Sequence, residues 1–278
     1  MTAVTLDRDA GSGPAPDRDA GARLLPASLA VARRTVLKYL RTPAILVLGT
    51  IQGAMFLLIF RYVFGGAISA GHLPYVDFLV PGYVTTSVLF IGMGSATGSA
   101  EDVEGGLFDR LRSLPIPRSA AVAGRVLADT GMLVWSLLVT TALGFAVGFR
   151  VHGSPASAVA AFGLCVVFGF AFCWLFIMLG LLAGNAQAAQ GAAFLVFPLT
   201  FVSSAYVPVG TMPGWMRGVA DHQPITVMVD AVRVLTEGHA ARAMLGHSAA
   251  YYVTASLVWT AAFVAVFAPL AVMRYRRG

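Results

Sequence analysis

The chain has 278 residues, of which 58% are hydrophobic and only 12% are charged. Soluble domains carry about 25% charged residues, so a soluble globular fold could not bury this much apolar surface. Residues 78–100 and 151–216 contain no Asp, Glu, Lys or Arg, and each run is long enough to cross a bilayer as a helix. A transmembrane barrel would instead show short alternating segments. The sequence therefore predicts an all-α polytopic membrane protein.

The formal net charge is +6, but the basic residues flank the apolar segments instead of gathering in one patch. This distribution indicates membrane topology and contact with the lipid bilayer, with no nucleic-acid partner. The two cysteines, Cys165 and Cys173, lie in an apolar run. On one helix they are too far apart to form a disulfide, so we interpret them as small hydrophobic residues.

The N-terminal region divides into two parts. Residues 1–25 are rich in Asp, Arg, Gly, Pro and Ala, which predicts a disordered cytoplasmic tail without a signal peptide. Residues 26–42 place Leu29, Ala32, Val36 and Leu40 on one helical face, with a basic face roughly opposite that contains Arg34, Lys38 and Arg41. We interpret this part as an amphipathic helix on the membrane surface. The alternative is a basic flank that only sets orientation.

Six apolar segments follow within a single transmembrane domain, residues 26–278. The predicted spans are about 43–64, 78–100, 120–149, 158–183, 192–209 and 248–272. With the N-terminus inside, the inner segments hold 14 Lys and Arg residues and the outer segments hold 5. Basic residues concentrate on the cytoplasmic side of membrane proteins. We therefore expect a multi-pass protein of the cytoplasmic membrane with both termini in the cytoplasm.

The segment 210–246 is too long for a tight turn and too apolar for a solvated loop. Within it, residues 224–237 have apolar side chains at helical spacing, and Asp230, Arg233 and Glu237 fall on the other side. Gly238 can end that helix. We predict two short re-entrant helices in the outer leaflet before the last span. An ordinary amphipathic loop helix is the alternative.

The chain lacks the residues that an enzyme or a self-powered pump requires. Its five histidines have no second ligand at i+3 or i+4, so we predict no metal site and no catalytic site. A phosphate-binding loop needs a lysine after glycine, and the only lysine, Lys38, follows Leu37. Asp129 is the only carboxylate expected inside a span, which leaves little basis for proton or sodium coupling. We expect no cofactor in this chain and ATP binding, if any, in a separate one.

The segment 101–118 is the most informative part of the sequence. Val103, Leu107, Leu111 and Leu114 form one stripe, while acids fill the first turn and arginines the last, as favours a helix. The Gly105–Gly106 pair costs about 2 kcal/mol relative to alanines, which indicates a need for close approach or bending. An apolar stripe outside the membrane favours a docking element; a solvated hairpin is the alternative. The predicted coupling residues are Glu101, Asp102, Glu104, Gly105, Gly106, Leu107, Phe108, Asp109, Arg110, Leu111 and Arg112.

From Leu29 to the C-terminus the chain resembles the permease subunits of type-2 ABC exporters, in particular the daunorubicin-resistance-like drug permeases of actinobacteria. The stretch 101–115 carries most of the resemblance. Further support comes from Arg118-Ser119, Gly124-Arg125, Arg41-Thr42-Pro43, Val63-Phe64-Gly65-Gly66, Phe78-Leu79-Val80-Pro81-Gly82 and Gln223-Pro224.

The resemblance implies an N-terminal connecting helix, a cytoplasmic coupling helix and outer re-entrant helices. It also implies a permease dimer, homodimeric or pseudo-dimeric, with two copies of an ABC ATPase subunit that bind ATP and Mg. We expect export of an amphiphilic drug-like compound or lipid between the first, second and fifth spans. The candidate path residues are Phe56, Phe60, Phe90, Phe194, Phe197 and Phe201, which could equally be lipid-facing or core residues. The alternative function is an ion-coupled transporter or channel that acts without an ATPase.

Overall fold

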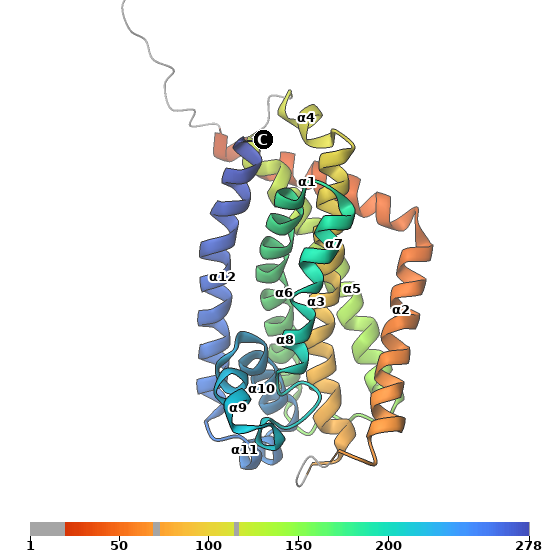
Figure 1. The fold of residues 1–278 in the computed structure, drawn as a ribbon, viewed down its shortest axis with the longest axis vertical. Coiled ribbons are helices and arrows are strands. Elements are labelled where there is room, and N and C mark those ends of the chain that lie inside the picture. The colour runs from red at the N-terminus through yellow and green to blue at the C-terminus, as the bar shows by residue number, and fades with distance from the viewer. Residues whose placement is uncertain (1–19, 69–72, 114–116, 278) are drawn as a thin grey trace, which may run out of the picture.

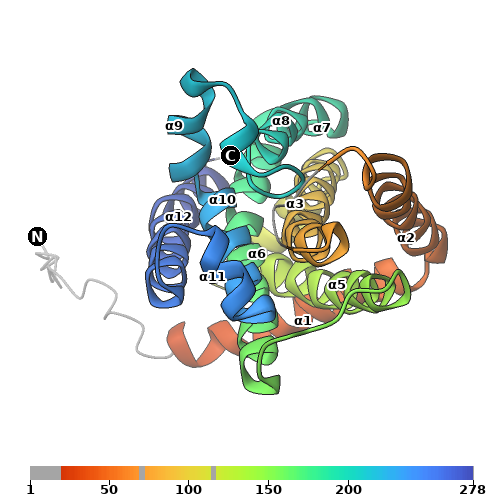
Figure 2. The ribbon, with the colours of Figure 1, turned by 90° about the horizontal axis from the view of Figure 1, so that it is seen from below.

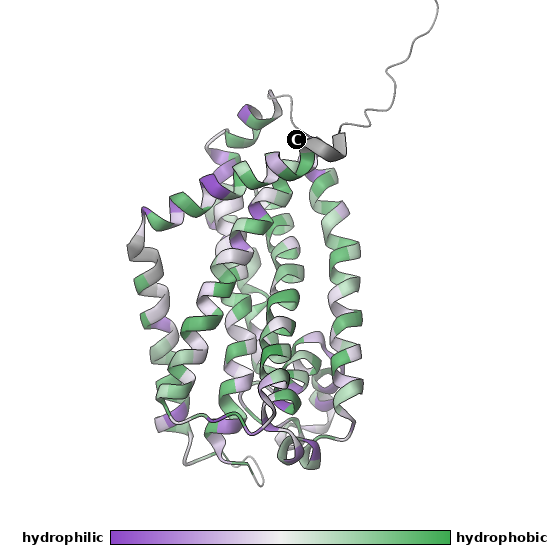
Figure 3. Cartoon of the chain, turned by 180° about the vertical axis from the view of Figure 1, so that it is seen from behind, coloured by the Kyte–Doolittle hydropathy of each residue, from purple (hydrophilic) through white to green (hydrophobic). Residues whose placement is uncertain are grey.

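The computed structural model describes residues 20–68, 73–113 and 117–277, and every regular element in these ranges is a helix (Figure 1). Within these ranges, four helices are long and apolar enough to cross a membrane. They are α3 (Tyr75–Glu104), α5 (Arg118–Ala146), α6 (Pro155–Ala183) and α12 (Ala249–Arg277). The predicted all-α membrane fold class is confirmed at this level. Hydrophobic residues dominate the long helices, and hydrophilic residues gather towards the two ends of the molecule (Figure 3).

The uncharged helix α6 lies at the centre, among α3, α5, α10 and α12 (Figure 2). Glycines let its neighbours come close. A Cβ added at Gly92 of α3 would lie 2.2 Å from the Phe176 ring of α6. A Cβ added at Gly180 of α6 would lie 2.2 Å from the Ala96 carbonyl oxygen of α3. Because Ala96 contributes backbone there, the two helices would have to separate to admit a side chain.

This contact gives a matched pair of glycine substitutions on one helix. Gly180→Ala should destabilise the protein by about 1–3 kcal/mol because it overpacks the α3–α6 interface. Gly163→Ala, where nothing lies within 4 Å of the added Cβ, should be neutral or stabilising. Melting temperatures of the two purified variants in detergent check this prediction. Equal melting temperatures would show that α3 and α6 can move apart without a loss of stability.

Two shorter apolar helices complete the bundle. The first, α2 (Pro43–Leu58), continues into a π-helix, η1 (Ile59–Phe64), and together they match the predicted first span. The second consists of α7 (Ala186–Phe194) and α8 (Phe197–Phe201).

The predicted bounds of the fifth span, 192–209, are wrong. The helix begins earlier because the Asn185 side chain caps α7 by accepting a hydrogen bond from the Ala188 backbone nitrogen at 2.8 Å. Residues 195–196 interrupt the helix, and regular structure ends at Phe201. The backbone from 202 to 208 is irregular, so it must find hydrogen-bond partners outside its own segment.

At one end of the bundle, α1 (Ala20–Leu40) lies across the long helices and packs on α5 (Figure 1). Residues 20–25, predicted to be disordered, belong to this helix, and the rest of the predicted tail lies outside the described residues. The predicted contact of the apolar face with the membrane surface stays a prediction. Ser28, Ala32 and Thr35 are buried, whereas Leu29 and Leu40 are exposed, because a close approach needs small side chains. A Cβ at Gly124 of α5 would lie 2.5 Å from the Ser28 carbonyl oxygen.

The opposite end holds a short 3-10 helix, η2 (Val209–Thr211), and three helices before α12 (Figure 1). They are α9 (Gly214–His222), α10 (Pro224–Glu237) and α11 (His239–Met244). The bounds predicted for α10 are confirmed. Its polar side is not solvated, however: Asp230, Arg233 and Glu237 are all buried.

Candidate functional site

The predicted coupling segment is not one continuous helix. Helix α3 runs on to Glu104, and Gly105 and Gly106 turn the chain before α4 (Leu107–Arg112). Gly106 has a φ of +63°, a left-handed conformation that favours glycine. The Gly-Gly pair thus separates two helices and does not weaken one.

The α4 turn presents a mixed surface. Phe108 is buried against Tyr275 of α12, with the ring centroids 5.1 Å apart. Leu107 and Leu111 are half-buried, and the exposed positions include Glu101, Glu104, Gly105 and Arg110. The side chains of Asp109 and Arg112, and residue Leu114, lie outside the described structure. The docking role of this segment stays a prediction.

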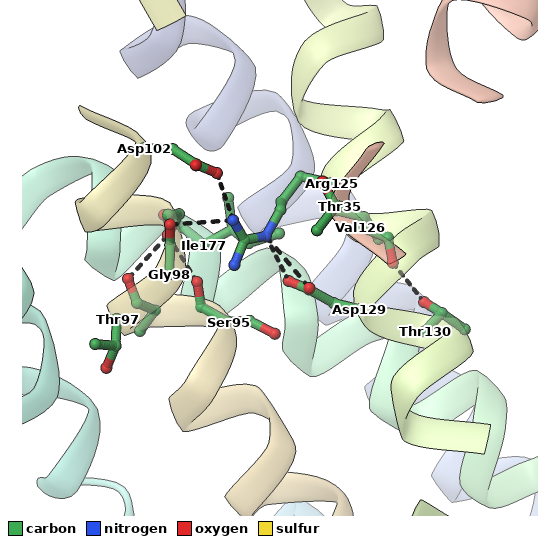
Figure 4. A network of polar contacts seen from close by, with 12 residues as sticks. Thr35, Ser95, Thr97, Gly98, Asp102, Arg125, Val126, Asp129, Thr130 and Ile177 are labelled. Carbon is green, nitrogen blue, oxygen red and sulfur yellow. Dashed lines mark hydrogen bonds and ion pairs between the residues drawn. The ribbon is translucent and has the colours of Figure 1, made fainter. Parts of the chain in front are cut away.

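A buried ionic network lies directly beneath this turn (Figure 4). Arg125 of α5 pairs with Asp102 of α3 through Nη1 and with Asp129 through Nε, at 3.1 Å from Oδ2. The same Nη1 donates to the Gly98 carbonyl oxygen at 3.0 Å. Asp129 is 1% exposed and Arg125 3%, so water contributes little to the solvation of these charges.

Helix α1 joins the same network. The Tyr39 hydroxyl donates to Asp129 Oδ1 at 2.8 Å and accepts from Arg125 Nη2 at 3.2 Å. Burial and the neighbouring Asp129 raise the pKa of Tyr39, so the hydroxyl stays protonated and can donate. Next to it, Lys38 Nζ lies 3.0 Å from Glu101 Oε2 at the surface.

These contacts change the interpretation of three predicted residues. Asp102 turns into the bundle, so its primary partner is Arg125 of the same chain. Asp129 is neutralised by Arg125 and is not a free carboxylate within a span. Lys38 pairs with Glu101 of α3, whereas Arg34 and Arg41 are exposed. The network therefore connects α1, the end of α3 and the start of α5 into one rigid unit.

All six predicted path aromatics come together on one side of the bundle. Phe56 lies near Phe60, Phe90 and Phe201, with ring centroids 4.9, 6.3 and 6.4 Å away. Phe197 lies near Phe90 and Phe194, at 5.4 and 5.2 Å, and also near Phe201. We call these six residues the aromatic face. It joins α2, η1, α3, α7 and α8, and it includes exposed rings, since Phe194 is 55% exposed.

Two tyrosines that the sequence analysis did not select complete the aromatic face. Tyr206 lies 4.8 Å from Phe60 and 5.6 Å from Phe56 between ring centroids, and its hydroxyl lies 2.9 Å from the Thr86 hydroxyl. Tyr83 stacks at 5.9 Å from Phe56 and donates to the Gly53 carbonyl oxygen at 2.7 Å. Tyr206 and Tyr83 are buried, at 1% and 3% exposure, and their hydroxyls bond to Thr86 and Gly53, so they support the aromatic face from inside the bundle.

A second buried ion pair holds the irregular segment 202–208. Arg233 of α10 contacts Asp230 Oδ1 at 2.8 Å and donates to the Ser204 and Phe78 carbonyl oxygens at 2.8 and 3.1 Å. Its guanidinium also covers the Phe78 ring at 3.8 Å. The polar side of α10 is therefore buried because it satisfies backbone groups that α8 leaves open after Phe201.

Three ligand-type side chains meet near the end of α10, although the sequence analysis predicted no metal site. They are Asp77, His152 and Glu237, whose ligand atoms all lie within 4.8 Å of one another. Because they come from three segments distant in sequence, a search for histidines with a ligand at i+3 or i+4 could not find them.

Comparisons with known proteins agree with this architecture. The sequence matches the ABC-2 type transporter family over residues 27–236. It is 34% identical over 261 residues to the daunorubicin resistance ABC transporter permease protein DrrB1 of Streptomyces coeruleorubidus, covering 94% of this chain and 89% of the relative. It is 27% identical over 173 residues to the probable doxorubicin resistance ABC transporter permease protein DrrC of Mycobacterium tuberculosis, covering 62% and 59% of the two chains. The chain belongs to the ABC-2 type transporter family, as a permease subunit.

Proposed function

We propose that this permease exports an amphiphilic drug-like compound or lipid across the cytoplasmic membrane, driven by a separate ATPase. The observation that carries this proposal is the 34% identity, over almost the whole chain, to a daunorubicin resistance permease. The aromatic face supports the cargo class, because flat and partly exposed apolar rings suit the apolar part of such a molecule. A sugar polymer would need a more polar surface.

The proposed topology has six spans, with α2–η1 and α7–α8 added to the four long helices. Helix α1, the α4 turn and the end of α12 share one end of the bundle, as the contact between Phe108 and Tyr275 indicates. We assign this end to the cytoplasm because its segments hold 14 of the 19 Lys and Arg residues. Helices α9, α10 and α11 then form the outer re-entrant segment.

The proposed assembly is a permease dimer with two ATPase subunits. Helix α2 stands at the edge of the bundle (Figure 2) and exposes Ile51 and Met55, and its continuation η1 exposes Tyr62 and Val63. The aromatic face lies beside it and is partly open, since Phe194 and Phe201 are exposed. Two copies that meet along this side would cover both surfaces and enclose a path between α2, α3 and α7–α8.

Coupling in this proposal passes through the α4 turn. An ATPase bound to the surface around Leu107 and Arg110 would move α3 when it changes conformation, because the Gly105–Gly106 turn connects α4 to α3. Arg125 would transmit the same movement to α5 and α1, since it bonds to Asp102, Asp129 and Tyr39. ATP and Mg would bind only to the partner.

Reconstituted vesicles test the proposal and its alternative together. The permease and its ATPase should move a fluorescent anthracycline only when ATP is present. Transport by the permease alone, driven by a proton or sodium gradient, would favour an ion-coupled transporter and overturn the proposal.

The coupling role gives a separate prediction. Leu107→Ser with Leu111→Ser should release the ATPase or uncouple ATP turnover from transport, because both side chains are half-buried apolar candidates for a helix-in-groove contact. Co-purification of the ATPase and drug-stimulated ATP hydrolysis measure the effect. The matched control is Leu37→Ser with Leu40→Ser, which changes two exposed leucines of α1. If Leu107→Ser with Leu111→Ser bound the ATPase and transported normally, α4 would be a solvated hairpin without a docking role.

A further inference from the structure

The side-chain cluster at the end of α10 is separate from the aromatic face and from the Arg125 network. Asp77 lies in the first turn of α3, His152 in the connection between α5 and α6, and Glu237 at the last position of α10. His152 Nδ1 lies 2.8 Å from Glu237 Oε2. One ligand atom from each residue lies within 4.8 Å of the other two.

The backbone holds these residues in place independently of the side chains. The His152 and Gly153 backbone nitrogens both donate to the Thr236 carbonyl oxygen, at 2.9 and 2.7 Å. A Cβ at Gly153 would lie 2.4 Å from the Leu235 carbonyl oxygen, so only glycine permits this approach. The connection is thus pinned to α10 next to Glu237, and the cluster is preorganised.

The cluster concentrates acidic groups, whose partners are the His152 imidazole and the Arg150 backbone nitrogen, which donates to Asp77 Oδ1 at 3.4 Å. The Glu237 side chain is fully buried and Asp77 is 5% exposed. Glu237 Oε1 is buried and has no hydrogen-bond partner. The nearby Arg150 guanidinium instead donates to the Phe145 and Phe149 carbonyl oxygens.

Among the described residues, His152 is the only basic side chain paired with either carboxylate. A buried carboxylate oxygen without a hydrogen-bond partner, beside a second carboxylate, is a group that a bound cation would satisfy. A positively charged partner would suit the two carboxylates, and the types of ligand atom determine which cation fits the cluster.

We propose that Asp77, His152 and Glu237 bind a divalent first-row transition-metal ion, with Zn²⁺ as the probe. One imidazole and two carboxylates form a donor set that suits zinc, whereas calcium and magnesium prefer oxygen ligands alone. Zinc holds tetrahedral ligand atoms about 3.3 Å apart, so small side-chain movements complete the site. His152, with a 54% exposed side chain, gives the ion access from solvent. The bound ion would fasten α3, the α5–α6 connection and α10 together.

Zinc binding to the full-length permease tests this inference. The protein is purified with an affinity tag that contains no histidine. Titration calorimetry should find one Zn²⁺ per chain, removable by a chelator, and zinc should raise the melting temperature where magnesium does not. His152→Ala should lower zinc affinity about tenfold or more. Because His152 is exposed and its loop is held through the backbone, this variant should still fold. Glu237→Gln should show the same loss.

His222→Ala is the matched control, since His222 is exposed at the same end of the molecule but outside the cluster. It should bind zinc as the wild type does. Equal zinc affinity in wild type and His152→Ala would overturn the proposal. Loss of binding in His222→Ala would also overturn it, by showing adventitious binding to surface histidines. None of these measurements depends on transport, so the proposed export function stands or falls separately.

Discussion

Arg125→Met should lower the stability of the permease by about 3–5 kcal/mol, because it leaves two carboxylates buried without their cation. Asp102 is 8% exposed and Asp129 is 1% exposed, so water cannot replace the guanidinium. The variant also loses the hydrogen bond to the Gly98 carbonyl oxygen, at 3.0 Å in the native protein. For a chain of this size the melting temperature in detergent should fall by about 10 °C.

Two control variants separate charge from position. Arg110→Met removes an exposed arginine from α4 and should change the melting temperature little. Arg125→Lys keeps the charge but loses the fork that contacts both carboxylates, and it should recover only part of the stability. If Arg125→Met had the same melting temperature as Arg110→Met, the Arg125 network would not be what holds α1, α3 and α5 together.

Asp230→Val should also destabilise the protein by about 3–5 kcal/mol, since it strands the guanidinium of Arg233 in a buried site. Amphipathic periodicity alone places Val232 on the apolar side of residues 224–237 and Asp230 on the polar side, so it predicts that Val232→Asp is more harmful than Asp230→Val. The structure instead buries both side chains, at 3% and 5% exposure, and both changes should impair folding. Unfolding midpoints of the two variants measure the difference.

A double variant separates the ion pair from the position. Asp230→Val with Arg233→Met removes both charges together, so it should be more stable than the sum of the single effects by about 0.5–3 kcal/mol. Recovery stays incomplete because the Ser204 and Phe78 carbonyl oxygens lose their donor. Asp221→Val, at an exposed position of α9, is the control and should be nearly neutral. Simple additivity in the double variant would mean that the two charges act independently.

The sequence alone determined the class of fold and many helix bounds. A long run without charged residues predicted α6. Pro224 and Gly238 marked the ends of α10, because proline is favoured in the first turn of a helix and glycine just after its end. The stretch 101–115 identified the transporter family. The six phenylalanines were candidates for the path that the family resemblance implied, and the structure brings them onto one face, whereas their role in transport stays a prediction.

Only the tertiary structure decided which polar side chains are buried. A period of 3.6 residues shows which positions share a helical face, but not whether that face meets lipid, water or another segment's backbone. Arg233 is buried because the irregular segment after Phe201 needs donors, and Asp102 turns inward because Arg125 of α5 lies beneath the Gly105–Gly106 turn. Asp77, His152 and Glu237 form a cluster only because the backbone of Gly153 fits against the end of α10. These arrangements depend on contacts between segments far apart in the chain, which local spacing does not encode.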